Sequence, residues 1–310
     1  MCQKNILLIG KNGQLGKAFI KYADLLDSNF YKFFFIGRDL LDLENSEEAI
    51  YDRVINNFDP DLIINTAAFT KVDKAEIFKE ISLKVNGESL KLISKQCKKR
   101  EIPLIHFSTD YVFNGLGFKP WKINHPTNPV NYYGETKLIG ENYIKRSSIN
   151  FVIFRVSWVF GHQGENFVNT MLNLSKKEEL KIVNDQFGGP TSAEYIAKKV
   201  IKLVPYILKN NSPLNNSKKL FPWGIYHLQG WPIVSWFEFA NKIFEKAIEL
   251  NLLNTSPRLL KTKTKDYKTV AHRPLNSILD CTETRFDLGI NQPFWENDLD
   301  EYLINFLSKR

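Results

Sequence analysis

Three glycines spaced three residues apart, Gly10, Gly13 and Gly16, follow a short apolar run at residues 5–9 and precede an amphipathic stretch. This order predicts a strand, a turn and a helix. The first glycine permits a tight turn, the second lets the backbone approach a pyrophosphate, and the third lets the helix pack close to the strand. The helix N-terminus offers free N–H groups and the positive end of a dipole to phosphates. The chain is therefore predicted to bind a dinucleotide at its start.

Short apolar runs alternate with longer amphipathic segments through the first half of the chain. The predicted strands cover residues 5–9, 32–37, 62–65, 103–108 and 151–156. The predicted helices cover residues 15–26, 46–58 and 81–100 and a segment starting near 131, with Ser46 as the N-cap of the second. Such alternation is typical of a parallel sheet covered by helices on both faces. We predict an α/β fold, a doubly wound parallel sheet of the Rossmann type.

The second half of the chain is less regular. Helices are predicted at residues 167–175, 193–208, 235–250 and 298–307, and short strands near 181–183 and 224–228. Residues 209–222, rich in Asn, Ser, Lys and Pro, are predicted as a surface loop. We divide the chain into a dinucleotide-binding domain at 1–160 and a smaller, mainly substrate-binding C-terminal lobe at 161–310. The return of some later segments to the first domain stays open.

Charge and composition restrict the partners. The formal net charge of +8 would attract polyanions, but the lysines are scattered over polar helical positions. No segment interleaves aromatic residues with a basic stripe, so nucleic acid is not an expected partner. No apolar run is long enough to cross a bilayer, so no membrane partner is expected. Cys2, Cys97 and Cys281 have neither metal nor disulfide spacing, which favours a cytoplasmic location.

The residues after the second predicted strand bear on the choice of cofactor. Arg38 suits the 2′-phosphate of NADPH, whereas Asp39 and Asp42 are of the type that holds the ribose of NADH. We favour NADPH and leave NADH open. After the third strand, the small-then-bulky Ala67-Ala68-Phe69 suits close passage beside an adenosine. The predicted cofactor contacts are Gly10, Gly13, Gln14, Leu15, Gly16, Arg38, Asp42, Leu43, Ala67, Ala68, Phe69, Tyr133 and Lys137.

Tyr133 and Lys137 are the predicted catalytic pair. They lie four residues apart near the start of a predicted helix and so share one face. An ammonium group beside a phenol lowers its pKa, which suits proton donation to a carbonyl. The lysine also suits the nicotinamide ribose. Thr109, at the end of the fourth strand, is the third predicted catalytic residue, although Ser108 qualifies by type.

A second Tyr-x-x-x-Lys pair, Tyr195 and Lys199, tests the specificity of this motif. It lies in a later amphipathic helix, so we interpret it as packing. The five histidines show no metal-ligand spacing, so no metal site is predicted and none of them is placed as a base. They are His106, His125, His162, His227 and His272.

Several long segments, taken together and in order, resemble the dTDP-4-dehydrorhamnose reductases, a family of extended short-chain dehydrogenases. The matching segments are residues 10–16, 65–76, 108–113, 133–137, 155–161, 184–191 and 273–277. The resemblance implies NADPH-dependent reduction of the 4-keto group of dTDP-4-dehydro-L-rhamnose to dTDP-L-rhamnose, with Tyr133 as proton donor. It also implies that Thr109 and Asp110 contact the dTDP-linked keto-sugar and that Trp158 packs on it. Asn166, Gln186 and Arg273 are further candidates for the substrate pocket.

One departure from the family affects metal and assembly. Some members carry an acidic residue two positions after the third glycine, where it takes part in a magnesium-bridged dimer. The corresponding residue here is Ala18. Magnesium therefore stays open, as does the choice between a monomer and a homodimer.

Two alternatives remain at this stage. The first is another nucleotide-sugar epimerase, dehydratase or reductase with the same tyrosine and lysine. A dehydratase would need an acidic pair beside Thr109, but Asp110 is followed by Tyr111. The second is a non-catalytic dinucleotide-binding regulatory subunit, like that of methionine adenosyltransferase. The intact Tyr133, Lys137 and Thr109 weigh against it.

Overall fold

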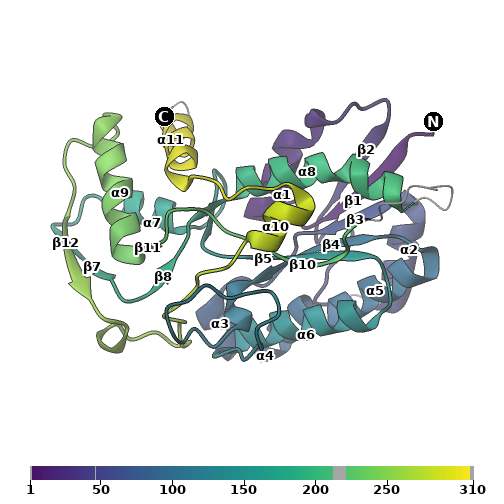
Figure 1. The fold of residues 1–310 in the computed structure, drawn as a ribbon, viewed down its shortest axis with the longest axis horizontal. Helices are drawn as coiled ribbons and strands as arrows, with labels where there is room; N and C mark the ends of the chain where they lie inside the picture. The colour runs from purple at the N-terminus through teal and green to yellow at the C-terminus, as the bar shows by residue number, and fades with distance from the viewer. Residues whose placement is uncertain (1, 46, 212–220, 308–310) are drawn as a thin grey trace.

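A six-stranded parallel sheet forms the centre of the computed structural model, which describes residues 2–45, 47–211 and 221–307 (Figure 1). The strand order is β10-β5-β4-β3-β1-β2, and all five pairings are parallel. The strands are β1 (Lys4–Ile9), β2 (Tyr31–Ile36), β3 (Leu62–Asn65), β4 (Leu104–Thr109), β5 (Phe151–Val156) and β10 (Gly224–Leu228). The predicted α/β fold is confirmed.

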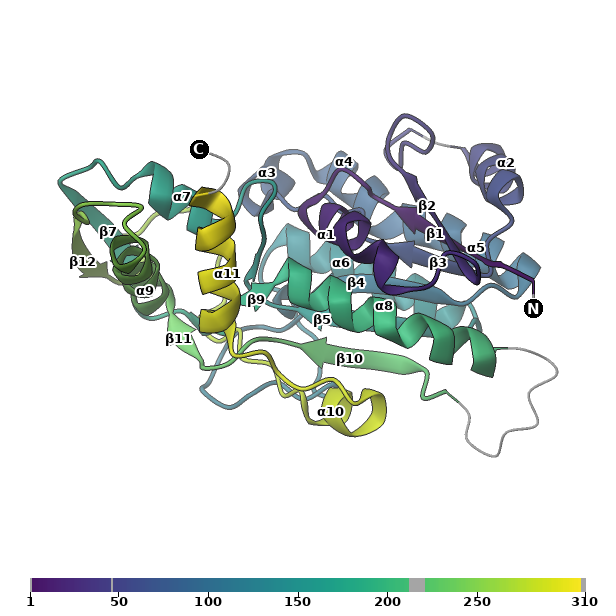
Figure 2. The same cartoon turned by 90° about the horizontal axis from the view of Figure 1, so that it is seen from above.

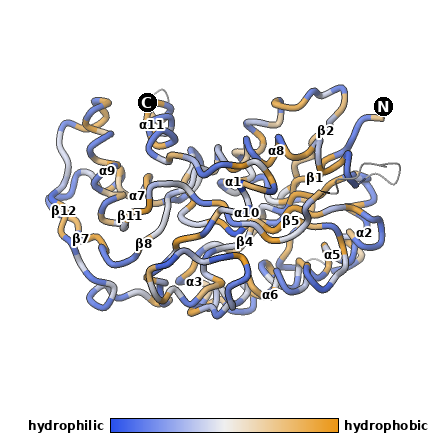
Figure 3. Tube along the Cα trace, viewed as in Figure 1, coloured by the Kyte–Doolittle hydropathy of each residue, from blue (hydrophilic) through white to orange (hydrophobic). Residues whose placement is uncertain are grey.

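Helices cover both faces of this sheet, as Figures 1 and 2 show. The helices are α1 (Gln14–Tyr22) and α8 (Ala193–Asn210) on one face, and α2 (Glu48–Phe58), α5 (Ser89–Arg100) and α6 (Tyr132–Arg146) on the other. Successive side chains of a strand point to opposite faces, so Ile6 and Leu8 pack under α1 while Leu7 and Ile9 pack under α2 and α5. Burial on both faces explains why apolar residues predominate in the central strands (Figure 3).

The segment after β3 differs from its predicted form. The predicted helix at 81–100 is divided into α4 (Lys79–Leu83), a π-helical turn (Lys84–Glu88) and α5. A further helix, α3 (Val72–Ile77), precedes it. The π-helical turn places Asn86 where its side chain hydrogen-bonds both backbone groups of Phe69, at 2.8 and 3.1 Å. That long-range contact gives the irregularity its physical reason.

The first two predicted helices also differ at their ends. The helix predicted at 15–26 ends at Tyr22 and continues as a 3-10 turn (Ala23–Leu25). Helix α2 begins at Glu48, and the backbone of Glu47 provides its N-cap. Ser46, the predicted N-cap, lies outside the described residues. Residues 212–220 of the predicted surface loop lie outside them too.

A separate hydrophobic cluster forms the C-terminal lobe, which we define as α7, α9, α11, β7 and β12. Their bounds are α7 (Phe167–Asn173), β7 (Glu179–Val183), α9 (Trp236–Glu249), β12 (Arg258–Thr262) and α11 (Trp295–Leu307). Phe160, Phe239 and Trp295 lie at its centre. Strand β12 was not predicted, because its residues are exposed or only partly buried and show no clear alternation.

Parts of the second half of the chain return to the central sheet. Strand β10 pairs in parallel with β5, and α10 (Thr282–Leu288) packs on β10. Short strands connect the sheet to the C-terminal lobe. They are β6 (Val159–Phe160), β8 (Phe187–Gly188), β9 (Thr191–Ser192) and β11 (Val234–Ser235). A 3-10 turn (Asp110–Val112) follows β4, and another (Thr264–Asp266) follows β12.

Candidate active site

The glycine turn lies where the strand order reverses between β1 and β3, the position at which ligands bind in open α/β sheets. Gly10 has a φ of +100°, and a Cβ on it would lie 2.6 Å from the backbone nitrogen of Ala67. A Cβ on Gly16 would lie 2.1 Å from the carbonyl oxygen of Gly10. Neither position accepts a side chain, so both glycines are needed to bring α1 against β1 and β3.

Gly13 has a different role, because a Cβ there would make only ordinary contact, 3.5 Å from the carbonyl oxygen of Gly10. It is the N-cap of α1, and no side chain caps that helix. The first-turn N–H groups therefore fit a pyrophosphate. Gln14 donates from Nε2 to the carbonyl oxygen of Val159 at 3.1 Å, and Leu15 packs against the α1–α8 side of the core.

Two cationic side chains lie near the end of β2. Arg38 is exposed, and Lys11, from the glycine turn, forms a 2.9 Å ion pair with Asp39. Asp42 accepts hydrogen bonds from its own turn, including the backbone N–H of Glu44 at 3.1 Å. Both acidic residues that left the cofactor choice mixed are thus engaged within the protein. Sequence reasoning missed Lys11, which approaches Asp39 only in the folded chain.

Three predicted cofactor contacts near β2 and β3 also have contacts within the protein. Leu43 is 7% exposed and belongs to the core on the α2–α5 side. The backbone N–H of Ala67 donates to Oδ1 of Asn65 at 3.1 Å, and Asn86 holds Phe69 through its backbone. Ala67, Ala68 and Phe69 are partly exposed in the segment that faces the glycine turn.

The first turn of α6 brings Tyr133 to the end of β4. Asn131 caps this helix, accepting the backbone N–H of Gly134 at 2.9 Å. A Cβ on Gly134 would lie 2.2 Å from the carbonyl oxygen of Tyr111, so the helix and the strand end are in close contact. The rings of Tyr111 and Tyr133 meet edge to face, with centroids 5.8 Å apart.

Thr109, Asp110 and Tyr133 form one connected group. Thr109 donates from Oγ1 to Oδ1 of Asp110 at 3.1 Å, and the group lies at the carboxyl end of β4. Burial and the charge of Asp110 raise the pKa of Tyr133, whereas a hydrogen bond with Thr109 lowers it. Burial also raises the pKa of Asp110 to about 7, and its Oδ2 atom is buried without a hydrogen-bond partner. An orphaned buried oxygen in a functional site suits a ligand hydroxyl.

Lys137 differs from its expected arrangement. Its side chain is 1% exposed, and Nζ lies 2.6 Å from the carbonyl oxygen of Phe107 and 3.2 Å from Nε2 of His106. Burial lowers the pKa of Lys137 to about 7, and Glu141 opposes that shift. The expectation that the lysine lowers the pKa of Tyr133 is therefore wrong for this structure, because burial dominates both groups.

A buried ion pair supports the same helix. Arg155 of β5 and Glu141 of α6 are 2% and 0% exposed and lie 2.7 Å apart. Ser108 donates to the second oxygen of Glu141 at 2.6 Å. The hydroxyl of Ser108 is thus engaged away from Asp110, which leaves Thr109 as the hydroxyl beside Tyr133. Sequence reasoning missed this pair, because it depends on the register between α6 and β5.

Trp158 is packed against protein on its ring faces. It stacks on Trp236 with centroids 3.6 Å apart and ring planes 11° from parallel. A Cβ on Gly188 would lie 2.7 Å from Cε2 of the same indole. The backbone of Trp158 is in the left-handed region, with a φ of +47°, a conformation often found at functional sites. Trp158 is partly exposed, so a ligand could still contact it.

The other predicted substrate residues separate into two groups. Asn166 caps α7 and donates from Nδ2 to Oε1 of Gln14 at 3.1 Å, so it lies beside the glycine turn. Gln186 donates to Oγ1 of Thr264 at 3.1 Å, and Arg273 forms a 2.5 Å ion pair with Asp73. Arg273 also interacts with Tyr111, which connects it to the Tyr133 group.

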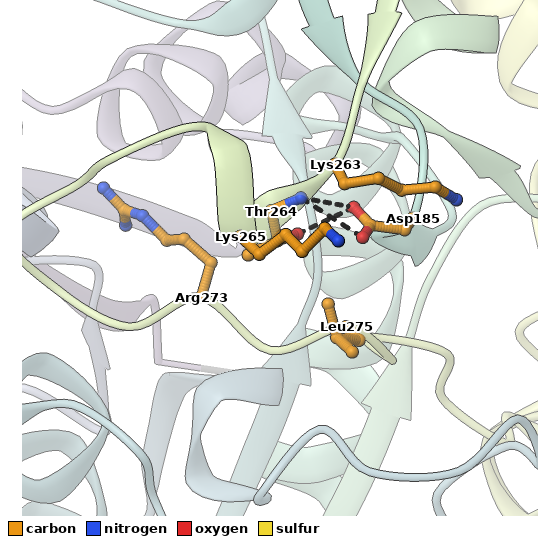
Figure 4. Close-up of a pocket in the computed structure, with 6 residues that line it drawn as sticks. All are labelled: Asp185, Lys263, Thr264, Lys265, Arg273 and Leu275. Atoms are coloured by element: carbon orange, nitrogen blue, oxygen red, sulfur yellow. Dashed lines mark hydrogen bonds between the residues drawn. The ribbon is translucent and has the colours of Figure 1, made fainter.

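A cavity of about 480 Å³ lies beside Arg273, next to the segments that follow β7 and β12. Figure 4 shows its six lining residues, with the guanidinium of Arg273 directed away from Asp185. They are Asp185, Lys263, Thr264, Lys265, Arg273 and Leu275. The carboxylate of Asp185 accepts hydrogen bonds from the backbone and hydroxyl of Thr264. Lys263 and Lys265 were not predicted as site residues, because scattered lysines carry little signal in a lysine-rich sequence.

The competing Tyr195 and Lys199 lie far along the chain from this group, on α8. Tyr195 donates its hydroxyl proton to the carbonyl oxygen of Asn291, and Lys199 lies over its ring at 5.2 Å. These contacts are structural.

Fold and site together define a class of protein. A parallel sheet with a glycine turn at its switch point, and a Tyr-x-x-x-Lys pair at the end of β4, are the features of a nicotinamide-dependent oxidoreductase of the short-chain dehydrogenase type. Comparison with known proteins then gives the family. The sequence matches the RmlD substrate binding domain over residues 4–308, and the chain belongs to the dTDP-4-dehydrorhamnose reductase family.

Three relatives illustrate the similarity. The dTDP-4-dehydrorhamnose reductase of Aggregatibacter actinomycetemcomitans is 35% identical, covering 95% of this chain and 96% of that protein. The enzyme of the same name from Escherichia coli K12 is 36% identical, covering 94% of both chains. The crystal structure of the Bacillus anthracis reductase in complex with NADP has a TM-score of 0.84 at 30% identity, covering 98% of this chain and 100% of that one.

Four further observations concern the remaining expectations. Among residues 2–45, 47–211 and 221–307, no helix combines the length and apolarity that a membrane span requires. Within the same described ranges, no group of three or more His, Cys, Asp or Glu side chains is arranged to hold a metal ion. Ala18 is 2% exposed and packs in the core between α1 and the sheet. All three cysteines are free thiols.

Proposed function

We propose that this chain reduces the 4-keto group of dTDP-4-dehydro-L-rhamnose to dTDP-L-rhamnose, with NADPH as the reductant and Tyr133 as the proton donor. The observation that carries the proposal is the connected group Thr109, Asp110 and Tyr133 at the carboxyl end of β4, in a chain of this family. We also expect a cytoplasmic location.

The cofactor proposal rests on the glycine turn and on the end of β2. The uncapped N-terminus of α1 suits the pyrophosphate, and Arg38 together with Lys11 suits a 2′-phosphate. The Bacillus anthracis relative was crystallised with NADP. Lys137 lies on the same helix face as Tyr133 and is our candidate for the ribose hydroxyls. When bound, NADPH supplies the hydride.

The proton comes from a side chain of the protein, whereas the hydride comes from the cofactor. Reduction builds negative charge on the keto oxygen, so a proton must arrive in or near the transition state. The phenol of Tyr133 keeps its proton at neutral pH, because burial and Asp110 raise its pKa. It is therefore an acid that releases the proton only to a strongly basic oxygen. Thr109 opposes the rise in the pKa of Tyr133, and Asp110 offers its unpartnered Oδ2 to a sugar hydroxyl.

The substrate proposal rests on the cavity of Figure 4. Two lysines, Lys263 and Lys265, line it, and Thr264 satisfies part of the hydrogen-bonding capacity of Asp185. This combination suits the diphosphate of a nucleotide sugar. We assign the partly exposed Trp158 to the sugar or the base, with Arg273 lining the cavity and Gln186 holding Thr264 beside it.

The decisive experiment is a cofactor-oxidation assay with dTDP-4-dehydro-L-rhamnose, with the nucleotide-sugar product identified by chromatography. We expect stoichiometric loss of NADPH and formation of dTDP-L-rhamnose. Conversion of the sugar without net NADPH loss would indicate an epimerase instead. Tight NADPH binding without any turnover would indicate the regulatory-subunit alternative, and either result would overturn the proposal.

A further inference from the structure

One stretch of chain supplies most of the wall of the cavity in Figure 4, and we call residues 263–275 the strap. The strap follows β12, and its residues 265–270 are all exposed. Five of the six residues that line the cavity belong to it. They are Lys263, Thr264, Lys265, Arg273 and Leu275. The shape of the cavity therefore depends on the contacts that hold the strap.

Both ends of the strap are attached to the segment that follows β7. At its start, the backbone N–H of Thr264 donates to the two carboxylate oxygens of Asp185 at 2.9 and 3.1 Å. The hydroxyl of Thr264 donates to the same carboxylate at 2.7 Å. At its end, the carbonyl oxygen of Leu275 accepts the backbone N–H of Phe187 at 2.8 Å. Neither attachment holds the middle of the strap.

Asp73 of α3 makes two contacts with the last part of the strap. Its Oδ1 atom accepts the backbone N–H of Ala271 at 2.9 Å, and its Oδ2 atom accepts from Nη2 of Arg273 at 2.5 Å. Ala271 is 1% exposed, although the residues before it are exposed. A carboxylate that uses both oxygens fixes direction as well as distance. The strap thus turns inward at the point where Asp73 meets it.

The same part of the strap lies beside the first turn of α6. Asn131, the N-cap of that helix, donates from Nδ2 to the carbonyl oxygen of His272 at 2.8 Å. On α3, Glu76 accepts the backbone N–H of Tyr132 at 2.8 Å. Helix α3 therefore contacts both the strap, through Asp73, and the turn of α6 that carries Tyr133.

The pair with Asp73 also determines where the guanidinium of Arg273 lies. Figure 4 shows this group directed away from Asp185. Burial raises the pKa of Tyr111, and the positive charge of Arg273 opposes that shift, so the guanidinium lies near the phenol. The ring of Tyr111 meets that of Tyr133 edge to face. Arg273 is thus held between α3 and the group around Tyr133.

We propose that Asp73 is a positioning residue of the substrate site, because its carboxylate holds the strap against α3 and places Arg273 beside Tyr111. It thereby sets the wall of the cavity for the sugar nucleotide, a ligand that rests on the proposed function. The side chains of Arg273 and Asp73 are 20% and 42% exposed, so the ion pair serves geometry more than stability. Glu76 and Asn131 hold α6 without Asp73. Its loss should therefore affect substrate binding more than proton delivery.

Hydrogen–deuterium exchange of the full-length protein without ligands gives the first test. In Asp73→Ala, the amide of Ala271 should exchange at least about tenfold faster, because its hydrogen bond to a carboxylate is lost. The amide of Asn276, which donates to the carbonyl oxygen of Gly115 at 2.9 Å, is the internal reference and should not change. An unchanged rate at Ala271 would overturn the proposal.

Glu80→Ala is the matched control for both tests. Like Asp73, Glu80 is an acidic residue in the first turn of a short helix, but its ion pair at 2.9 Å is with Lys84 and not with the strap. The substitution is the same and also removes one negative charge. Exchange at Ala271 and the kinetic constants should match those of the unsubstituted protein.

Steady-state kinetics give the second test. In Asp73→Ala, the Michaelis constant for the sugar nucleotide should rise at least about fivefold. Turnover and the Michaelis constant for NADPH should each change by less than about twofold, a split that a general loss of stability would not produce. Because Asp73 acts through Arg273, the double variant with Arg273→Ala should fall well short of additive. An unchanged constant for the sugar nucleotide, or additive effects, would overturn the proposal.

The exchange measurement requires neither substrate nor turnover. If the unsubstituted protein oxidises no NADPH, the proposed function fails, and exchange at Ala271 still decides whether Asp73 holds the strap. If the protein is active but Asp73→Ala leaves either that exchange or the sugar-nucleotide constant unchanged, the inference about Asp73 fails alone.

Discussion

Trp158 stacks on Trp236, which begins α9 in the C-terminal lobe. The pair joins the segment after β5 to the lobe, so the position of Trp158 depends on a residue almost 80 positions later (236 − 158 = 78). The capping box of Ser235 and Glu238 fixes the first turn of α9 and with it the orientation of Trp236.

We therefore expect both Trp158→Ala and Trp236→Leu to raise the Michaelis constant for the sugar nucleotide while NADPH affinity is kept. Because an aromatic pair contributes about 0.5–1.5 kcal/mol, the effect of Trp236→Leu should be roughly two- to tenfold. Steady-state kinetics with both substrates measure it. Trp223→Leu, which changes a tryptophan packed near Phe221, is the matched control. Unaltered sugar-nucleotide kinetics in both variants would mean that the pair serves only packing.

Tyr133→Phe keeps the ring and its edge contact with Tyr111 but removes the proton. Turnover should fall by about 10²–10⁴-fold, the usual contribution of positioned acid catalysis, with NADPH affinity largely kept. Lys137→Ala should reduce both turnover and cofactor binding, and the double variant should fall well short of additive. Tyr195→Phe should match the unsubstituted enzyme. Full activity in Tyr133→Phe would refute the assigned proton donor.

Arg38→Ala tests the cofactor preference. Hydrogen bonds to charged groups contribute about 1.5–3 kcal/mol, so the Michaelis constant for NADPH should rise by roughly 10- to 100-fold. The constant for NADH should change little, because NADH lacks the 2′-phosphate. Lys32→Ala, at the opposite end of β2, should alter neither. Equal losses for the two cofactors would contradict the role given to Arg38.

Lys137 should make stability depend on pH above neutrality. Its pKa is about 7 in the folded chain and 10.5 for the usual group, so the unfolded state binds more protons between these values. Stability from this residue therefore rises with pH across that window, by up to about 1.4 kcal/mol per unit. Lys137→Met should be most stabilising, relative to the unsubstituted chain, at pH 7 and less so at pH 9. Urea unfolding at both values measures the difference, and an equal offset at both would show that burial leaves this pKa unshifted.

The local parts of the fold could be predicted because short-range signals determine them. The glycine turn, β3 and β5 follow from apolar runs bounded by glycines or polar residues. The π-helical turn could not be predicted, because its cause is the contact between Asn86 and Phe69, 17 residues earlier. Likewise, a spacing of four predicts that Tyr133 and Lys137 share a helix face, but nothing local predicts that Lys137 turns to His106. The ion pair of Arg155 with Glu141 could not be predicted from one sequence either, because it depends on how β5 is aligned with α6 in the folded chain.

The pairing of β10 with β5 has a consequence for how the protein is made. The ribosome must extend the chain to about Leu228 before β5 gains its outer neighbour, and α8 must emerge before the α1 side of the sheet is covered. Until then the nascent chain presents an open, apolar strand edge and a bare sheet face, which are the surfaces that promote misassembly. Completion of the nucleotide-binding half thus waits for residues synthesised some seventy positions after its last contiguous strand (228 − 156 = 72).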